Sequence, residues 1–348
     1  MAKIKIKIKN LYKIFGNNPK AAMEHVRGGA SKQSLLDERG HVLGLRDINL
    51  DVPEKKIQVV MGLSGSGKST LIRHINRLIE PTEGQVVVDG EDVLAMSQDD
   101  LREFRRHKSS MVFQKFALLP HRTVAQNAAY GLTIQGIAEG EAAERAQRWI
   151  DRVGLGGFEN HFPAQLSGGM QQRVGLARAL ATDAEILLMD EAFSALDPLI
   201  RTDMQDILLD LQEELHKTIV FITHDLDEAL RIGDQIAILR DGESIQQGDP
   251  QDIILRPADD YISDFIKDIN RGRVIEVRSV MAKAARASGP KLPMDTALED
   301  ALQTLASVGK DTGTVVDHDG KTIGKIDINA AITAMARPDR GTSQPRYK

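Results

Sequence analysis

Gly62, Leu63, Ser64, Gly65, Ser66, Gly67, Lys68, Ser69 and Thr70 follow one another directly, after the apolar run 57–61. Their order matches G-x-x-x-x-G-K-[ST], in which glycines let successive backbone N–H groups face phosphates at the start of a helix. Lys68 is then placed to reach the β- and γ-phosphates of a nucleotide, and the Ser69 hydroxyl to bind Mg²⁺. A glycine-rich turn that binds no phosphate would need neither the lysine nor the serine side chain. The stretch therefore predicts a phosphate-binding loop in which Gly62 and residues 64–70 hold the cofactor.

The surrounding pattern predicts an α/β fold. The run 57–61 and two further apolar runs, 185–189 and 218–222, fit buried strands of a parallel sheet that is covered on both faces. The helix that begins at Lys68 carries apolar residues on one face. Residues 138–153 form another strong helical pattern in a stretch with little strand character. We therefore expect a helical subdomain, at roughly 115–175, inserted into the α/β core.

A second chemical feature is the pair Asp190 and Glu191, which ends the apolar run of ILLMDE. Ligands of a parallel α/β sheet bind beyond the carboxyl ends of its strands. Asp190 is placed to hold magnesium, directly or through water, and Glu191 to position and polarise an attacking water. Many strands run into acidic loops, so an Asp-Glu pair alone is weak evidence for a site. This pair is informative because a phosphate-binding loop precedes it in the chain.

Ser167, Gly168 and Gly169 stand just before a second predicted helix. The N-terminus of that helix is another potential phosphate-binding site. The segment LSGGMQQR resembles the signature motif of the ABC ATPases. In that family, the signature of one subunit closes over the ATP that the other subunit holds. The resemblance therefore implies a homodimer with composite ATP sites.

Further motifs of the same family occur in the expected order. Gln114 in MVFQ matches the Q-loop glutamine, SALD ending at Asp197 matches the D-loop, and His224 in VFITHD matches the switch histidine. Phe15 of YKIFG is preferred over Tyr12 as the aromatic residue that stacks on adenine. The resemblance implies catalytic roles for Lys68, Gln114, Glu191 and His224, and metal binding by Ser69, Gln114 and Asp190.

Three longer segments narrow the family: MGLSGSGKSTLIRHINRLIEPTEG, MDEAFSALDPLIRTDMQ and FITHDLDEALRIGDQIAIL. They resemble the quaternary-amine uptake branch, for glycine betaine, choline or proline, over roughly residues 3–270. The resemblance implies an ATP- and Mg²⁺-dependent importer subunit on the cytoplasmic face of the membrane. Its expected partners are a second copy, permease subunits and a periplasmic or extracellular binding protein. Histidine, proline and trimethylamine N-oxide remain open as cargo.

The C-terminal part differs in pattern. We expect an ATPase domain over 1–270, a small module over 271–336 and a disordered tail over 337–348. The module shows a strand at 274–277 (VIEV), a helix at 296–308, a hairpin at 312–327 and a helix at 329–335. It resembles a single CBS-type module, whose nucleotide-facing Ser/Thr and Asp would fall near Asp327 and Asn329. Whether it senses a nucleotide or ionic strength stays open.

Composition limits the other possibilities. The 348 residues carry a formal net charge of −5, which does not suit broad nucleic-acid binding, and no cysteine. No run of about 18 apolar residues is present that would predict a membrane-spanning helix. The opening KIKIKIK predicts a strand with lysines facing solvent, and 17–42 an insertion at the sheet edge. A soluble ABC ATPase of translation or DNA repair is the second hypothesis, but the chain shows neither two cassettes nor long coiled coils.

Overall fold

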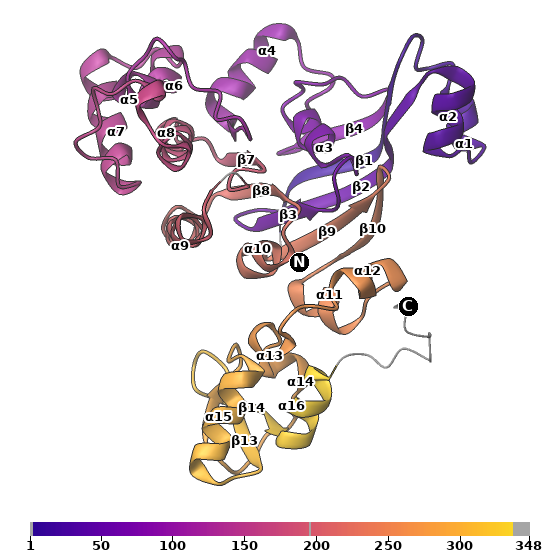
Figure 1. The fold of residues 1–348 in the computed structure, drawn as a ribbon, viewed down its shortest axis with the longest axis vertical. Coiled ribbons are helices and arrows are strands. Elements are labelled where there is room, and N and C mark those ends of the chain that lie inside the picture. Colours follow the sequence, from indigo (N-terminus) through magenta and orange to yellow (C-terminus); the bar gives the residue numbers. More distant parts are fainter. Residues whose placement is uncertain (1–2, 195, 337–348) are drawn as a thin grey trace, which may run out of the picture. The chain divides into compact units, whose positions relative to one another are not determined.

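The computed structural model describes residues 3–194 and 196–336, which divide into one compact unit up to Gln247 and another from Gly248 (Figure 1). The predicted tail 337–348 and Ala195 lie outside the described residues. Among the residues that are described, none of the helices combines the length and the apolar character that crossing a membrane requires.

A six-stranded sheet forms the centre of the first unit, in the order β10-β9-β3-β8-β7-β6. The pairs of β3 with β8 and β9, and of β7 with β6 and β8, are parallel. The strands β3, β7 and β8 are buried along their whole length, which confirms the three predicted buried strands. The bounds are β3 (Ile57–Met61), β6 (Ser109–Val112), β7 (Ile186–Asp190), β8 (Thr218–Thr223), β9 (Gln235–Arg240) and β10 (Glu243–Gly248).

A second sheet is antiparallel and has the order β2-β1-β4-β5. Leu71, Ile72 and Ile75 of α3 (Lys68–Ile75) share one hydrophobic core with side chains from both sheets. This packing fixes the helix that follows the phosphate loop, since its apolar face has buried partners on either side. The strands are β1 (Ile4–Phe15), β2 (Val42–Pro53), β4 (Glu83–Val88) and β5 (Glu91–Asp92).

One lysine of β1 departs from the prediction that this strand's lysines face solvent. Lys5 is 4% exposed, and its Nζ lies 2.8 Å from Oδ2 of Asp89 and also bonds to Glu185. Two carboxylates compensate the buried ammonium, so a charged side chain can take an inward position of the strand.

The predicted insertion consists of two short helices, α1 (Met23–Arg27) and α2 (Lys32–Arg39), between β1 and β2. Met23, Val26 and Leu35 pack with Ile14 and Leu43 of the two strands in a small core of their own. The insert is therefore anchored on the β1–β2 hairpin.

The predicted helical subdomain is present as a group of helices that lie together in Figure 1. It comprises α5 (Val124–Ala128), α6 (Tyr130–Ile134), α7 (Glu139–Arg152) and α8 (Gly168–Ala181), and Leu132, Ala142 and Ala181 form its core. The other helices of the unit are α4 (Gln98–Glu103), which continues into a π-helical turn over Phe104–Lys108, α9 (Pro198–Leu215) and α10 (Leu226–Ile232).

The second unit contains a four-stranded sheet in the order β11-β14-β13-β12, in which only the pair β12–β13 is parallel among the described strands. The strands are β11 (Ala282–Lys283), β12 (Lys291–Pro293), β13 (Thr312–Val316) and β14 (Thr322–Asp327). The helices are α11 (Pro250–Leu255), α12 (Asp260–Phe265), α13 (Arg271–Val274), α14 (Val277–Val280), α15 (Leu298–Val308) and α16 (Ile328–Met335).

The predicted strand at 274–277 is wrong. Val274 ends α13 and Val277 begins α14, and between them Glu276 makes a single bridge to Ala297. Ile275 and Val277 are fully buried. The apolar character of Ile275 and Val277 reflects their burial at the turn between two helices. Such burial does not require a strand.

The division between the units lies 23 residues before the boundary expected near residue 270, since it follows Gln247. Arg271 is the reason, because its buried guanidinium donates from Nε to the Ala334 carbonyl (3.0 Å) and from Nη1 to the Ile254 carbonyl (3.2 Å). The side chain of Gln251 likewise donates to the Val274 carbonyl at 2.9 Å. Helix α11 therefore packs with the C-terminal elements.

Candidate functional site

The phosphate loop leaves β3 and enters α3 through three glycines with left-handed backbone. Gly62, Gly65 and Gly67 have φ angles of 148°, 77° and 102°. A Cβ atom at Gly62 would lie 2.1 Å from the Leu239 carbonyl oxygen. Glycine is required there for space as well as for conformation. The residues following β3 thus form the tight turn that the sequence predicts.

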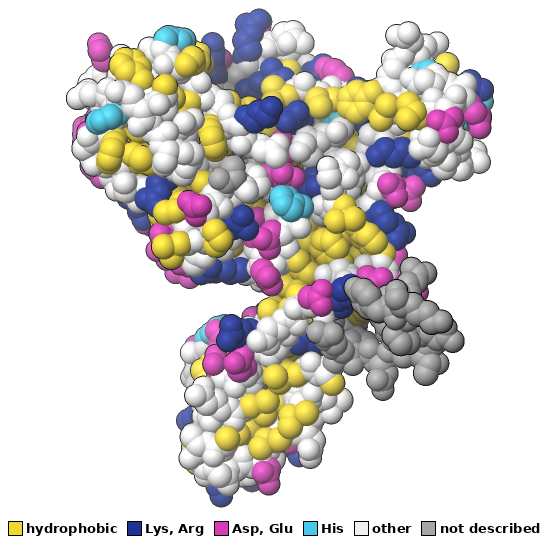
Figure 2. All heavy atoms as spheres, viewed as in Figure 1, with side chains coloured by type: hydrophobic (Ala, Val, Ile, Leu, Met, Phe, Trp, Pro, Cys, Tyr) yellow, Lys and Arg dark blue, Asp and Glu magenta, His cyan; other side chains and the backbone are white. Residues whose placement is uncertain are grey.

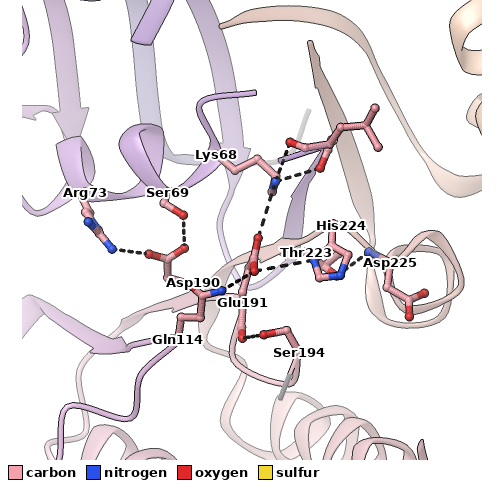
Figure 3. Close-up of polar contacts among 12 residues, drawn as sticks. Lys68, Ser69, Arg73, Gln114, Asp190, Glu191, Ser194, Thr223, His224 and Asp225 are labelled. Carbon is pink, nitrogen blue, oxygen red and sulfur yellow. Dashed lines mark hydrogen bonds and ion pairs between the residues drawn. The ribbon is translucent and has the colours of Figure 1, made fainter. Parts of the chain in front are cut away.

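Lys68 is the first residue of α3 and is buried. Its Nζ donates to the carbonyl oxygens of Gly62 (2.8 Å) and Leu63 (3.1 Å) and lies 3.7 Å from Oε1 of Glu191. Burial lowers the pKa of this lysine, and the neighbouring Glu191 charge partly opposes that change. The ammonium is therefore held inside the curve of the loop, next to the acidic pair (Figure 3).

Asp190 ends β7 as a fully buried carboxylate. Its Oδ1 accepts a 2.7 Å hydrogen bond from the Ser69 hydroxyl, and its Oδ2 accepts one of 3.1 Å from Nη2 of Arg73. A hydroxyl oxygen and a carboxylate oxygen thus meet beside the phosphate loop, and these are ligand types that Mg²⁺ prefers. No cluster of three or more His, Asp or Glu that could hold a metal occurs among the described residues. The donor set fits an ion that completes its shell with phosphates and water.

Arg73 is a residue of this site that the sequence prediction missed. Ser69 and Arg73 are four residues apart on α3, so their side chains lie on one face of the helix. The four-residue spacing between Ser69 and Arg73 could have predicted that Arg73 lies beside the metal-binding hydroxyl.

Glu191 lies at the centre of the contacts in Figure 3. Its Oε2 accepts a 2.7 Å hydrogen bond from Nε2 of Gln114 and lies 3.7 Å from Nδ1 of His224. The Glu191 backbone has a φ of 46°, and its N–H donates to the Ile222 carbonyl of β8 at 3.1 Å. The Ser194 hydroxyl donates to the Glu191 carbonyl at 3.0 Å. The structure therefore brings the four predicted catalytic residues together.

His224 follows β8 directly and is about half exposed. The next residue, Asp225, caps α10 with its side chain and forms a 2.9 Å ion pair with Nη1 of Arg201 on α9. The cap and the ion pair fix the turn that presents the imidazole. His224 is thus held at the carboxyl end of the parallel sheet, beside Glu191.

The signature segment lies at another place in the first unit. Ser167 caps α8, and its Oγ accepts a 3.3 Å hydrogen bond from the Met170 N–H. A pocket of about 360 Å³ is lined by Ser167, Gly168 and Gly169 together with Leu196 and Asp197. Its described lining includes none of residues 62–70. The predicted signature and D-loop residues are therefore neighbours, separate from the phosphate loop of the same chain.

Phe15 and Tyr12 differ in their surroundings. Tyr12 packs against the core of the insert, whereas Phe15 is 39% exposed at the end of β1. The Lys13 ammonium lies 4.8 Å from the Phe15 ring centroid. An exposed ring is open to a stacking partner. The preference for Phe15 as the adenine-stacking residue stays a prediction.

Comparisons with known proteins identify the family. Residues 45–194 match the ABC transporter family. The chain is 48% identical to the glycine betaine/proline betaine transport ATP-binding protein of Escherichia coli K12, over 96% of the chain and 83% of that protein. It is 47% identical to the glycine betaine transport ATP-binding protein of Bacillus subtilis 168, over 94% and 79%. It is 44% identical to the trimethylamine N-oxide transport ATP-binding protein of Pelagibacter ubique, over 92% and 94%.

A solved structure supports the same assignment. A dimeric ATP-binding cassette bound to ADP and phosphate is 34% identical, covers 70% of this chain and 98% of its own, and has a TM-score of 0.61. The chain belongs to the quaternary-amine uptake family of ABC transporter ATP-binding subunits, whose activity is ATP hydrolysis coupled to transport.

Proposed function

We propose that this chain drives an importer of a methylated amine such as glycine betaine or proline betaine. The ATP hydrolysis that would drive the importer is supported by the convergence of Lys68, Gln114 and His224 on Glu191 beside the phosphate loop. The named relatives serve transport of glycine betaine, proline betaine and trimethylamine N-oxide. These compounds share a methylated nitrogen, so the proposal commits to that chemical class.

The proposed chemistry is in-line attack of water on the γ-phosphorus of ATP. Glu191 orients the water and accepts its proton as the new P–O bond forms and the bond to ADP breaks. Lys68 offsets negative charge on the β- and γ-phosphates, and His224 contacts the γ-phosphate. The buried Lys68 ammonium and the Glu191 carboxylate, which is 14% exposed, support these roles, because charges held in place act strongly where little water reaches them.

Ser69, Gln114 and Asp190 are proposed to hold Mg²⁺. Held by these residues, the ion would supply positive charge that offsets the negative charge developing on the phosphates during transfer. The Ser69 and Asp190 oxygens are 2.7 Å apart, and Arg73 keeps the second Asp190 oxygen occupied. This leaves the oxygen next to Ser69 as the one directed at the loop.

A homodimer with composite sites is proposed because the signature segment and the phosphate loop lie apart in one chain. Ser167 to Gly169 of one subunit would close over the ATP that Lys68 of the other subunit holds. The D-loop residue Asp197 lines the same pocket as the signature and would lie at the dimer interface. A similar cassette is dimeric with ADP and phosphate bound.

The proposed partners are permease subunits and an external binding protein, with the chain on the cytoplasmic face of the membrane. The test is uptake of labelled glycine betaine by vesicles that contain the complete transporter and internal ATP. Unlabelled proline betaine, choline, trimethylamine N-oxide, proline and histidine serve as competitors. Competition by methylated amines alone supports the proposal. Purification of the tagged chain with ribosomes or DNA in place of a permease would refute it.

The C-terminal unit is proposed as a single CBS-like regulatory module. The order β12, α15, β13, β14 and α16, with one parallel and one antiparallel neighbour for β13, supports this proposal. Asp327 caps α16 through a 2.8 Å hydrogen bond from the Ala330 N–H, and Asn329 is exposed. Because Asp327 serves the helix, ionic strength is a better candidate signal than a bound nucleotide. Uptake measured against salt concentration, with and without residues 248–348, tests this role, because the compact C-terminal unit begins at Gly248.

A further inference from the structure

The insert between β1 and β2 reaches the phosphate loop through Lys32. This lysine begins α2, and its Nζ donates a 2.9 Å hydrogen bond to the Gly65 carbonyl. Leu35, one turn along the same helix, is buried against Ile14 and Leu43. An anchored helix therefore holds Lys32 against the loop, so the contact does not depend on a free surface side chain.

A pocket of about 460 Å³ lies between α2 and β2, next to this contact. Its lining includes the apolar side chains of Leu36 and Val42 and the charged side chains of Lys32 and Arg46. The volume falls within the range of about 300–1,000 Å³ that small-molecule sites occupy. A few polar groups around apolar walls are the usual composition of such a site.

The aromatic residue preferred for adenine is the cross-strand neighbour of Val42, which lines this pocket. Phe15 and Val42 are directly paired in the β1–β2 register, so their side chains share one face. Phe15, Leu36 and Val42 are 39%, 44% and 42% exposed. Figure 2 shows hydrophobic side chains gathered on the surface between β4 and α2. The apolar surface at this edge is therefore continuous with the place where a base would stack.

The strand β2 also touches the phosphate loop directly. A Cβ atom at Gly67 would lie 2.7 Å from the Gly44 carbonyl oxygen. Gly44 in turn packs against the ring of Phe15. One strand thus contacts both the phosphate loop and the aromatic ring and contributes Val42 to the pocket wall.

Charge in the pocket favours the uncharged end of a nucleotide. Lys32 and Arg46 are matched in the lining by the carboxylates of Asp241 and Glu243, and Nη1 of Arg46 lies 3.0 Å from Oε1 of Glu243. Carboxylates repel phosphate but accept hydrogen bonds from hydroxyl and amino groups. The balanced lining therefore suits a ribose and a base better than a phosphate.

We propose that the insert 17–41 forms one wall of the nucleotide site and that the pocket beside Lys32 takes the adenosine part of ATP. Leu36 and Val42 contact the base beside Phe15, and Lys32 ties this wall to Gly65 so that it keeps a fixed distance from the phosphates. The inference rests on the proposed use of residues 62–70 as the phosphate site.

The test measures binding of MgATP and of magnesium tripolyphosphate to the full-length protein with Leu36→Asp. Leu36 is a half-exposed side chain, so the variant should fold, and Leu78→Asp is the matched control at a leucine that is 48% exposed. We expect Leu36→Asp to weaken MgATP binding about tenfold or more. Its tripolyphosphate affinity, and both affinities of the control, should stay at the parent values.

Two results would overturn the inference. Unchanged MgATP affinity in Leu36→Asp would show that the pocket is not part of the nucleotide site. An equal loss of MgATP and tripolyphosphate affinity would show a disturbed phosphate loop in place of a base contact. Failure of residues 62–70 as the phosphate site is distinguishable, because the parent protein would then bind neither ligand, and failure of the proposed cargo would leave both affinities unchanged.

Discussion

Nε2 of Gln114 donates a 2.7 Å hydrogen bond to Oε2 of Glu191, across 77 residues of sequence. The two residues follow β6 and β7, which are neighbours in the parallel sheet. Gln114 also begins the segment that leads into the helical group α5–α8. The residue proposed to orient the attacking water is therefore directly bonded to the start of that group, and a movement of the segment would move the Glu191 carboxylate.

At saturating Mg²⁺, which offsets the loss of one proposed ligand, Gln114→Ala should lower kcat for ATP by roughly tenfold and leave nucleotide affinity near the parent value. The reason is that Glu191 loses one of the two partners that orient Oε2, while the phosphate loop is unchanged. Steady-state ATPase assays and equilibrium nucleotide binding on the purified chain give the two quantities. A proportional loss of affinity would show that Gln114 acts mainly in binding.

Glu191→Gln should bind MgATP like the parent and hydrolyse it more slowly by a factor of about 10²–10⁴. The amide preserves the shape of the side chain but accepts no proton, so ATP should accumulate in a closed dimer that size-exclusion chromatography detects.

Glu213→Gln is the matched control for this change, since Glu213 is an exposed carboxylate on α9. It should behave as the parent in both assays. Turnover by Glu191→Gln within twofold or so of the parent would refute the role of Glu191 as the general base.

Ser69→Ala should raise the Mg²⁺ concentration needed for half-maximal ATPase activity by roughly tenfold. The hydroxyl that lies 2.7 Å from Oδ1 of Asp190 is removed, and with it a proposed oxygen ligand. A Mg²⁺ titration at saturating ATP measures the change, and chelation should abolish activity in the parent. The control Ser307→Ala, in the C-terminal unit, should leave the half-maximal Mg²⁺ concentration unchanged. An unchanged half-maximal concentration in Ser69→Ala would contradict the role of Ser69 as a ligand.

Acid should destabilise the protein through His74, which is fully buried on α3. Its Nδ1 donates to the Thr70 carbonyl at 2.6 Å, and its Nε2 is buried without a hydrogen-bond partner. Burial lowers the pKa of this histidine from 6.5 to about 4. The unfolded chain therefore takes up the proton at a higher pH than the folded chain does. The stability present above pH 6.5 is lost as the pH falls toward 4.

Between pH 7 and pH 5, this histidine should lower the free energy of unfolding by about 2 kcal/mol. Urea denaturation at the two pH values measures the loss. In His74→Asn, which keeps a side-chain donor, the drop between the two pH values should be smaller by about that amount. An equal drop in both proteins would contradict the assignment.

The catalytic part of the site could be predicted from the sequence because its residues lie in short, ordered segments. The glycine spacing of 62–70 specifies a turn that few other sequences adopt, and Asp190 and Glu191 end a strand whose burial is evident from its composition. The family resemblance implied roles for Gln114 and His224, and the parallel strands β6, β7 and β8 bring their carboxyl ends, with Glu191, to one edge of the sheet. The direct bond between Gln114 and Glu191 depends on side-chain geometry that no spacing rule contains.

Other features depend on long-range packing and were not predicted. Lys5 is buried because Asp89 and Glu185, far along the chain, supply two carboxylates. Ile275 and Val277 are apolar because they are buried at the turn between α13 and α14. No function was predicted for the insert, because the sequence of the insert contains no recognisable motif. The contact of Lys32 with the Gly65 carbonyl forms only when the chain folds.

The central claim is that each ATP site combines Lys68 of one subunit with Ser167 of the other, and mixing two inactive variants tests it most directly. Lys68→Ala and Ser167→Arg should each lack ATPase activity when assayed alone. In a heterodimer both changes fall in one site, so the other site has an intact phosphate loop and an intact signature. The account predicts that the mixture regains ATP turnover well above either variant. A mixture as inactive as its two components would contradict it.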